Sequence, residues 1–320
     1  MRLSVVVPCY NEEDALPHTA PALERFMLDL ASRGIIAGDS NVWLIDDGSS
    51  DGTWPLIEDL ARRSELFVGV KLARNRGHQH ALLAGLLSAD GDAVISIDAD
   101  LQDELGAIED MLAAHAAGYE IVYGVRRARQ ADSRFKRWTA AAYYRLLRVL
   151  GADIVPGHAD FRLLGRDAIS GLASYTEVNL FLRGIIPQLG FRSTSVLYDR
   201  NARIAGRSKY SLASMMRLAT DGITSFSAVP LRMIAALGAI VCAFSFAMVI
   251  WILFVRLFTD RALPGWASTT VPVYLIGGLQ LLCLGIVGEY VAKIYMETKA
   301  RPRYLIERIE RRSASNANRT

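Results

Sequence analysis

The sequence predicts an α/β domain with a mainly parallel sheet, followed by two long apolar helices. Short runs rich in β-branched residues occur at Leu3–Val7, Val42–Ile45, Phe67–Leu72, Ala93–Ile97 and Glu120–Tyr123. Amphipathic helical patterns separate the first four runs and follow the fourth, near residues 15–32, 54–63, 78–88 and 105–117. Strands that alternate with helices form parallel sheets covered on both faces. Ligands bind such sheets at the carboxyl ends of the strands.

The apolar helices are predicted from two runs without charge. Residues 233–255 contain no charged side chain over 23 positions, and residues 262–288 contain none over 27. About 20 apolar residues cross the hydrocarbon core of a bilayer. We therefore expect a transmembrane hairpin within residues 231–294, with helices over about 233–255 and 270–292, because Pro264 and Pro272 favour a later start of the second helix. Two buried helices of a soluble core are the alternative.

The charge distribution predicts the orientation of this hairpin. The chain holds 36 Lys and Arg against 33 Asp and Glu, but residues 231–320 hold 11 against 5. Most of this excess follows the second helix, in the basic tail 295–320. By the positive-inside rule, we expect an integral protein of the cytoplasmic membrane whose catalytic domain and both termini are cytoplasmic. The beginning of the chain shows no secretory signal, and the three cysteines do not suggest a disulfide scaffold.

Two further segments have alternative interpretations. Residues 210–230 carry apolar side chains at helical spacing, which predicts either an amphipathic interfacial helix or a core helix of the domain 1–209. Residues 299–312 fit either a helix resting on anionic headgroups or a solvated basic tail.

Carboxylates follow three of the predicted strands. Glu12 follows the first strand, Asp46 and Asp47 follow the second, and Asp98 and Asp100 follow the fourth. On an extended strand, Asp98, Asp100 and Gln102 would face the same side, where a hard divalent cation offsets the repulsion of two carboxylates. A helix cap or a solvated turn is the alternative for an isolated D-x-D. Neither a G-x-G-x-x-G fingerprint nor a Walker A loop occurs, which argues against dinucleotide oxidoreductases and P-loop nucleotidases.

These motifs resemble family 2 glycosyltransferases of the polyprenyl-phosphate type, the group of bactoprenol glucosyltransferases and dolichyl-phosphate mannose synthases. The residues that carry the resemblance are 5–13, 45–53, 75–79, 97–103, 158–163, 183–184 and 203–210. The resemblance implies a GT-A (Rossmann-like) nucleotide-sugar domain beside the cytoplasmic leaflet. It also implies a membrane-bound enzyme that moves one sugar to undecaprenyl or a related polyprenyl phosphate, with no nucleic acid partner. Association of copies of the chain is compatible with this pattern.

The resemblance also assigns roles to individual residues. Asp98, Asp100 and Gln102 would bind Mg²⁺ or Mn²⁺ against the donor diphosphate, and Asp160 would lie near the reacting carbon. The base and ribose of the nucleotide sugar would be held by Pro8, Tyr10, Asn11, Glu12 and Asp46 or Asp47. The acceptor phosphate would be held by Arg126, Arg137, Arg200, Arg203 and Lys209.

The acceptor phosphate is already an anion, so Asp160 is expected to orient it more than to deprotonate it. One-step displacement would invert the anomeric configuration. We expect UDP-glucose as donor, with a UDP-N-acetylhexosamine, a UDP-aminoarabinose derivative or GDP-mannose as alternatives. A non-catalytic subunit that binds lipid-linked sugar is the alternative of a different class.

Two segments depart from the family pattern: the first predicts a differently shaped loop after the D-x-D-x-Q motif, and the second leaves the donor open. The segment after the D-x-D-x-Q motif reads Asp103-Glu104-Leu105-Gly106, where many relatives carry a proline pair. Glu177-Val178-Asn179 stands where relatives often show Glu-Arg-Asn. No Q-x-x-R-W motif occurs, which counts against a processive polysaccharide synthase.

Overall fold

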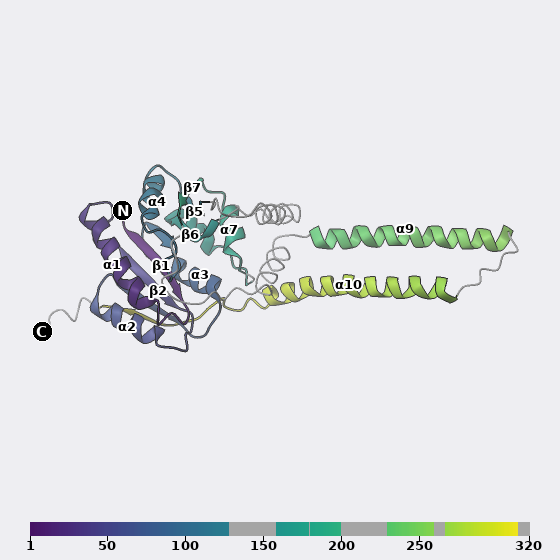
Figure 1. Ribbon diagram of the computed structural model, residues 1–320, viewed down its shortest axis with the longest axis horizontal. Helices are drawn as coiled ribbons and strands as arrows, with labels where there is room; N and C mark the ends of the chain where they lie inside the picture. Colours follow the sequence, from purple (N-terminus) through teal and green to yellow (C-terminus); the bar gives the residue numbers. More distant parts are fainter. Residues whose placement is uncertain (128–157, 179, 200–228, 259–265, 313–320) are drawn as a thin grey trace. The chain divides into compact units, whose positions relative to one another are not determined.

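The computed structural model describes residues 1–127, 158–178, 180–199, 229–258 and 266–312. The chain divides into two compact units, one of residues 1–141, 154–211 and 301–320 and one of residues 142–153 and 212–300. The described residues of the first unit form an eight-stranded sheet with the strand order β7-β5-β6-β4-β1-β2-β3-β8, and helices flank this sheet (Figure 1). The strands are β1 (Leu3–Cys9), β2 (Asn41–Asp46), β3 (Phe67–Leu72), β4 (Ala93–Ser96), β5 (Ile121–Arg126), β6 (His158–Gly165), β7 (Ser193–Tyr198) and β8 (Ile306–Arg311).

The pairing of the strands confirms the predicted mainly parallel sheet. Strand β1 lies parallel to both β2 and β4, β2 is parallel to β3, and β5 is parallel to β7. Strand β6 runs antiparallel between β4 and β5, and β8 runs antiparallel along β3. All residues of β1, β2 and β4 are buried, as expected for central strands covered on both faces.

Helices cover both faces of this sheet. The helices are α1 (Leu16–Ser32), α2 (Thr53–Arg63), α3 (His78–Ser88), α4 (Ala107–Ala116), α6 (Arg166–Ala173) and α7 (Leu182–Gln188). Buried side chains of α1, α2 and α4 share one apolar core with Val5, Leu44 and Ile95. On the opposite face α3 lies so close that a Cβ at Gly85 would meet Val6 and Ile45. Strand β6 therefore turns Phe161 and Leu163 toward the first core and Arg162 toward the other face.

Gly48 fixes the approach of the loops that follow β2 and β3. Its φ of +66° lies in the left-handed region, and a Cβ there would stand 2.6 Å from the backbone nitrogen of Asn75. Only glycine meets both demands without strain. The turn after β2 is therefore held against the loop that leads into α3.

Strand β8 corrects the helical interpretation of the basic tail. Residues 306–311 form a strand on the open edge of β3, with a register that pairs Val70 with Ile309. Ion pairs join it to neighbouring elements, among them Lys71–Glu307 at 3.0 Å and Arg308–Glu58 at 3.1 Å. The unpaired edge of β3 and the acidic and basic partners around it favour a strand over the helix that composition alone suggested.

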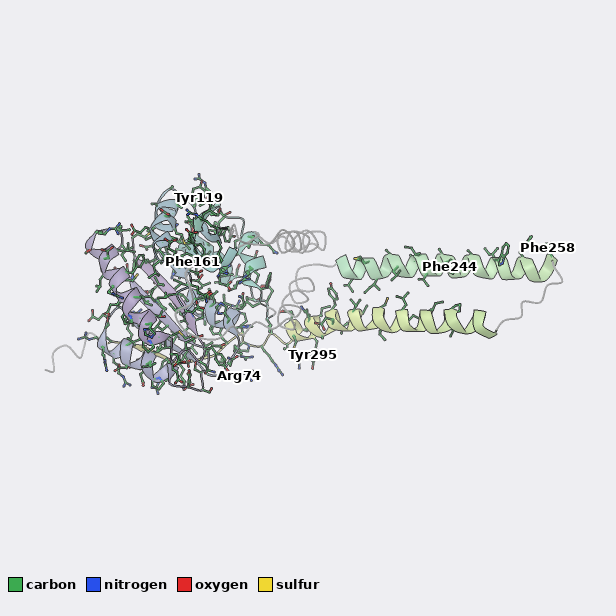
Figure 2. The ribbon with its side chains drawn as sticks, in the orientation of Figure 1. Arg74, Tyr119, Phe161, Phe244, Phe258 and Tyr295 are labelled. Atoms are coloured by element: carbon green, nitrogen blue, oxygen red, sulfur yellow. The ribbon has the colours of Figure 1, made fainter. Side chains whose placement is uncertain are left out.

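The second unit contains two long helices, α9 (Val229–Phe258) and α10 (Trp266–Thr298), at the positions where the sequence predicts helices. Phe244 and Phe258 project from α9 with 67% and 73% of their surface exposed (Figure 2). No helix among the described residues has the length and apolarity required to cross a bilayer, so the structure does not support the predicted transmembrane hairpin. The predicted interfacial helix at 210–230 lies almost entirely outside the described residues.

Candidate active site

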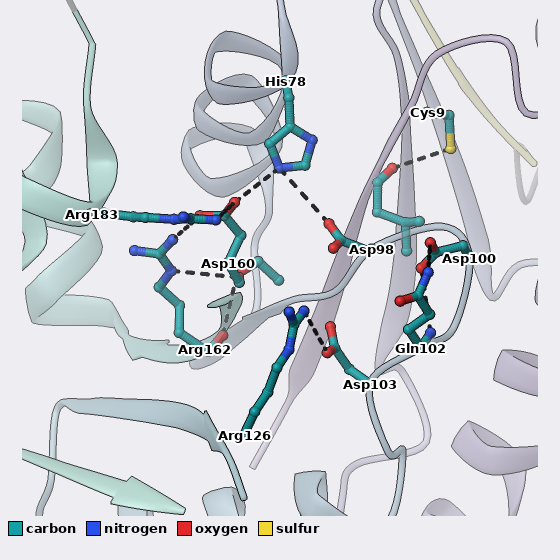
Figure 3. Close-up of polar contacts among 12 residues, drawn as sticks. Cys9, His78, Asp98, Asp100, Gln102, Asp103, Arg126, Asp160, Arg162 and Arg183 are labelled. Carbon is teal, nitrogen blue, oxygen red and sulfur yellow. Dashed lines mark hydrogen bonds and ion pairs between the residues drawn. The ribbon is translucent and has the colours of Figure 1, made fainter. Parts of the chain in front are cut away.

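The candidate site lies where β1, β2 and β4 end and β6 begins. Asp46 is the last residue of β2, where it pairs with Cys9 of β1, and Asp98 follows β4. Asp160 lies in β6, which is hydrogen-bonded to β4, and His78 is the first residue of α3. Residues far apart in the sequence thus meet at one edge of the sheet (Figure 3). This is the position at which parallel sheets bind ligands.

The structure separates the roles of the two adjacent aspartates after β2. Both oxygens of Asp47 accept backbone hydrogen bonds, from Arg76 at 2.7 Å and from Gly77 at 2.8 Å. Asp46 is fully buried, and its Oδ1 accepts a hydrogen bond from the backbone N–H of Ser49 at 3.2 Å. Its Oδ2 has no hydrogen-bond partner among the described residues. Burial raises the pKa of both carboxyls. Asp47 therefore holds the loop before α3, whereas Asp46 retains an oxygen for a ligand.

The loop after β1 is tied to the loop after β2. Asn11 adopts a φ of 53°, and its Oδ1 accepts a hydrogen bond from the backbone N–H of Ser50 at 3.0 Å. Glu12 donates its backbone N–H to Thr53 Oγ1 at 2.8 Å. Pro8 is buried inside β1, and Tyr10 is 41% exposed. The loop that carries these four predicted nucleotide-binding residues is thus held against the loop that follows Asp46, and Tyr10 offers an exposed ring there.

The D-x-D-x-Q segment forms a turn instead of the expected extended strand. Strand β4 ends at Ser96, and Leu101 has a φ of 46°. Gln102 donates its side-chain amide to Asp100 Oδ2 at 2.5 Å, while Asp98 points toward His78. The alternation of side chains along a strand therefore does not apply here, because the chain leaves the sheet before Asp98.

The carboxylates after β4 suit a divalent ion that a substrate also binds. They suit less well an ion that protein side chains alone would hold. No group of three or more His, Cys, Asp or Glu side chains among the described residues is arranged to hold a metal. Partial burial raises the pKa of Asp98 to about 6, helped by the negative charges of Asp103, Asp160 and Asp100. Mg²⁺ is commonly bound by one or two carboxylates together with substrate phosphates. Asp98 and Asp100 fit that pattern, with Gln102 orienting Asp100.

Asp160 is enclosed by three nitrogen-bearing side chains. Arg162 Nη2 lies 2.5 Å from Asp160 Oδ1, and Arg183 donates Nε at 3.2 Å and Nη2 at 2.9 Å. His78 Nε2 lies 3.4 Å from Oδ2 and 3.9 Å from Asp98 Oδ1. Burial alone would raise the pKa of Asp160, but its hydrogen bond with His78 and the charges of Arg162 and Arg183 hold it well below its ordinary value. Asp160 is therefore ionised at neutral pH and is a weak proton acceptor.

Arg126 is held by a second polar cluster. It donates Nε to the Tyr198 hydroxyl oxygen at 2.9 Å, and Tyr198 donates its hydroxyl hydrogen to Asp103 Oδ1 at 2.5 Å. Arg126 Nη2 lies 3.5 Å from the same oxygen of Asp103. Burial and the Asp103 carboxylate raise the pKa of Tyr198, so its hydroxyl stays protonated. One predicted acceptor cation thus lies at the site beside the D-x-D-x-Q turn.

The other predicted acceptor residues, Arg137, Arg200, Arg203 and Lys209, lie outside the described residues. The structure adds five side chains to which the sequence reasoning gave no role, namely His78, Asp103, Arg162, Arg183 and Tyr198. The first four lie within motifs that carry the family resemblance, and this position could have identified them as site residues from the sequence. Tyr198 is on no such motif and is identified by the fold alone.

Comparison with known proteins identifies the family. The model of glycosyl transferase family 2 matches residues 4–172. The chain belongs to this family. An uncharacterized glycosyltransferase of Bacillus subtilis, YkoT, is 46% identical over 95% of the chain and 91% of its own length. A prophage bactoprenol glucosyl transferase homolog of Escherichia coli is 36% identical over 97% of the chain and 100% of its own length. The bactoprenol glucosyl transferase of Shigella phage SfX is 37% identical over 96% and 99%.

Proposed function

We propose that this family 2 glycosyltransferase moves one sugar from a nucleotide sugar to a polyprenyl phosphate such as undecaprenyl phosphate, with inversion at the anomeric carbon. The observation that carries the proposal is that Asp98 and an ionised Asp160 enclosed by cations both lie against the same side chain, His78, with Asp100 in the turn directly after Asp98. The near full-length similarity to proteins named bactoprenol glucosyl transferase supports the lipid acceptor. The same names support UDP-glucose as first donor, ahead of UDP-N-acetylhexosamine, UDP-aminoarabinose derivatives and GDP-mannose.

The donor would bind along the loops after β1, β2 and β4. Asp46 offers a buried oxygen, without a partner among the described residues, to a hydrogen-bond donor of the base or ribose, and the exposed ring of Tyr10 can stack on the base. Pro8, Asn11 and Glu12 shape the same loop. Asp98 and Asp100 would hold Mg²⁺ or Mn²⁺, with Gln102 fixing Asp100. When bound, the ion would offset the negative charge that the nucleoside diphosphate gains as it leaves.

The acceptor phosphate can attack without a strong base. Its oxygen is already anionic near neutral pH, so the bond to the anomeric carbon forms while the bond to the diphosphate oxygen breaks and its electron pair leaves with the nucleotide. Asp160, ionised and held by Arg162 and Arg183, would orient the reacting groups. Arg126 would hold the acceptor phosphate, together with Arg137, Arg200, Arg203 and Lys209.

We further propose that α9 and α10 hold the chain at the cytoplasmic membrane, with the catalytic unit on the cytoplasmic side. Large apolar side chains are exposed on both helices, among them Phe244, Trp251 and Leu284. Exposed apolar surface on this scale marks a contact with protein or lipid. The excess of basic residues after α10 favours the cytoplasmic side.

The test is incubation of membranes that carry the full chain with polyprenyl phosphate and a panel of labelled UDP- and GDP-sugars, with and without EDTA. We expect one labelled lipid whose formation EDTA abolishes. Asp100→Asn should lower turnover by about 100-fold or more, because removal of one group that stabilises transition-state charge has effects of this size. Absence of a labelled lipid with every donor would refute the proposed reaction. Labelled lipid that forms equally well in EDTA would refute the role of the metal.

A further inference from the structure

Arg126 is held on one edge of its guanidinium by two side chains from different elements. Nε donates to the hydroxyl oxygen of Tyr198 in β7, and Nη2 lies 3.5 Å from Asp103 in the loop after β4. A guanidinium carries five N–H donors in a planar fork. These contacts use only the Nε and Nη2 edge, and about a third of the side chain, 33%, is exposed. The guanidinium is thus fixed in orientation while part of it faces the site.

Tyr198 is a rigid support for this contact. It is 1% exposed, and its ring meets Phe161 edge to face, with centroids 5.1 Å apart and an interplanar angle of 84°. Phe161 directly follows Asp160 in β6. The hydroxyl of Tyr198 therefore has a position that is set by the same packing that sets the backbone at Asp160.

Asp103 connects this support to the D-x-D-x-Q turn. Its side chain is 1% exposed, and its Oδ1 accepts the Tyr198 hydroxyl hydrogen. Its Oδ2 is buried with no partner among the described residues. A buried carboxylate contributes little stability unless its hydrogen bonds are satisfied. The buried Asp103 carboxylate costs stability, and packing does not explain its presence. Its contacts with Arg126 and Tyr198 explain it, because they position both side chains beside the turn.

We propose that Tyr198 and Asp103 are positioning residues that orient Arg126 toward the phosphate monoester of the lipid acceptor. The inference rests on the proposed function, which supplies the acceptor. Its physical content is pre-organisation: an arginine already fixed on one edge loses less side-chain entropy when the other edge binds a phosphate. Loss of the Tyr198 hydroxyl should therefore weaken acceptor binding and leave nucleotide binding unchanged.

The test is calorimetric binding of farnesyl phosphate and of UDP-glucose with Mn²⁺ to the detergent-solubilised full chain. For Tyr198→Phe we expect the dissociation constant for farnesyl phosphate to rise about five-fold, the loss typical of one hydrogen bond. The constant for UDP-glucose should stay within about two-fold. Tyr119→Phe is the matched control, because Tyr119 contacts Arg192 away from the site. Asp103→Asn is a second variant for which the same selective loss is expected.

A double-mutant cycle tests the connection through Arg126. In an Arg126→Met background, Tyr198→Phe should cause no further loss of farnesyl phosphate affinity. Additive losses, an unchanged affinity in Tyr198→Phe, or equal losses for both ligands would overturn the inference. A wild-type chain that binds farnesyl phosphate but transfers no sugar would refute the proposed function and leave the positioning role standing. A wild-type chain that does not bind farnesyl phosphate would overturn both.

Discussion

At the scale of single residues, the site uses the same residue type in different electrostatic states. Asp47 has both oxygens saturated by backbone N–H groups, and Asp46 keeps one buried oxygen without a described partner. Asp98 has a raised pKa because of partial burial and nearby carboxylates, and Asp160 has a lowered pKa because His78, Arg162 and Arg183 surround it. Environment therefore decides which carboxylate binds, which holds the backbone and which orients the reacting groups.

The two adjacent aspartates give the first prediction. Asp47→Asn should lower the free energy of unfolding by about 2 kcal/mol, because an amide cannot accept both backbone hydrogen bonds. Asp46→Asn should change stability little and raise KM for UDP-glucose about ten-fold. Urea unfolding and donor kinetics measure the two effects. Equal losses of stability in both variants would contradict the distinction.

Asp160 gives a prediction about acid stability. Its folded-state pKa lies below the unfolded value of about 3.9, so its contribution is present above that pH and is lost as the pH falls through the folded pKa. Arg183→Gln removes one partner and raises the folded pKa, so acid unfolding followed by circular dichroism should begin at a higher pH, by about half a unit. Arg166→Gln is the control, because Arg166 donates to a backbone carbonyl, that of Ala89. An unshifted acid transition in Arg183→Gln would contradict this account.

At the scale of elements, β1 to β5 could be predicted from the sequence, whereas the interior strand β6 and the two edge strands, β7 and β8, could not. The apolar runs at residues 3–7, 42–45, 67–72, 93–97 and 120–123 all occur as strands, because a strand buried on both faces must be apolar throughout. Strand β7 alternates exposed and half-buried side chains, and β8 is mostly charged and exposed. Their pairing depends on a neighbouring edge that no local pattern reveals.

The residues of the candidate site also fall into two groups, those that the sequence could predict and those that only the fold identifies. Asp98, Asp100 and Asp160 could be predicted because each belongs to a short motif that the family resemblance identifies. The three side chains around Asp160 come from α3, β6 and α7, and only the fold brings them together. Asp98 and Asp100 were predicted to follow the fourth strand, as they do, but their expected common face assumed extended geometry, and the pattern does not show the turn that replaces it.

Strand β8 gives a prediction at this scale. Deletion of residues 305–320 should lower the stability of the chain by about 3 kcal/mol, because it removes the backbone pairing with β3 and its ion pairs. Deletion of residues 313–320 is the matched control, since it leaves β8 intact. Urea unfolding compares the two. Equal stability of both truncated chains would show that β8 does not stabilise the sheet.

At the scale of the whole molecule, the chain combines a polar catalytic unit with an unusually exposed apolar pair of helices. Unit 1 contains every described residue of the candidate site, and unit 2 contains α9 and α10. The proposed acceptor is a lipid, so an apolar unit would give the enzyme access to a substrate that does not dissolve in water. The excess of basic residues after α10 agrees with binding to anionic lipid.

Vesicle flotation tests the proposed membrane contact. The wild-type chain should float with vesicles of phosphatidylethanolamine and phosphatidylglycerol. The double variant Phe244→Asp, Trp251→Asp should lose a large part of this binding, since each change places a charge on the exposed apolar face of α9. Leu28→Asp is the control, because Leu28 is an exposed apolar residue of unit 1, on α1. Full flotation of the double variant would contradict a role for this face.

The reaction we propose for this chain is one-step transfer of a sugar to a lipid phosphate. The most direct measurement is the mass and the anomeric configuration of the product that the purified full chain forms from UDP-[¹³C]glucose and undecaprenyl phosphate with Mn²⁺. We expect a single added hexose, linked through phosphate in the β configuration. A product with an α linkage would contradict direct displacement, and the absence of any glycosylated lipid with UDP-glucose and with each of the alternative donors would contradict the proposed reaction itself.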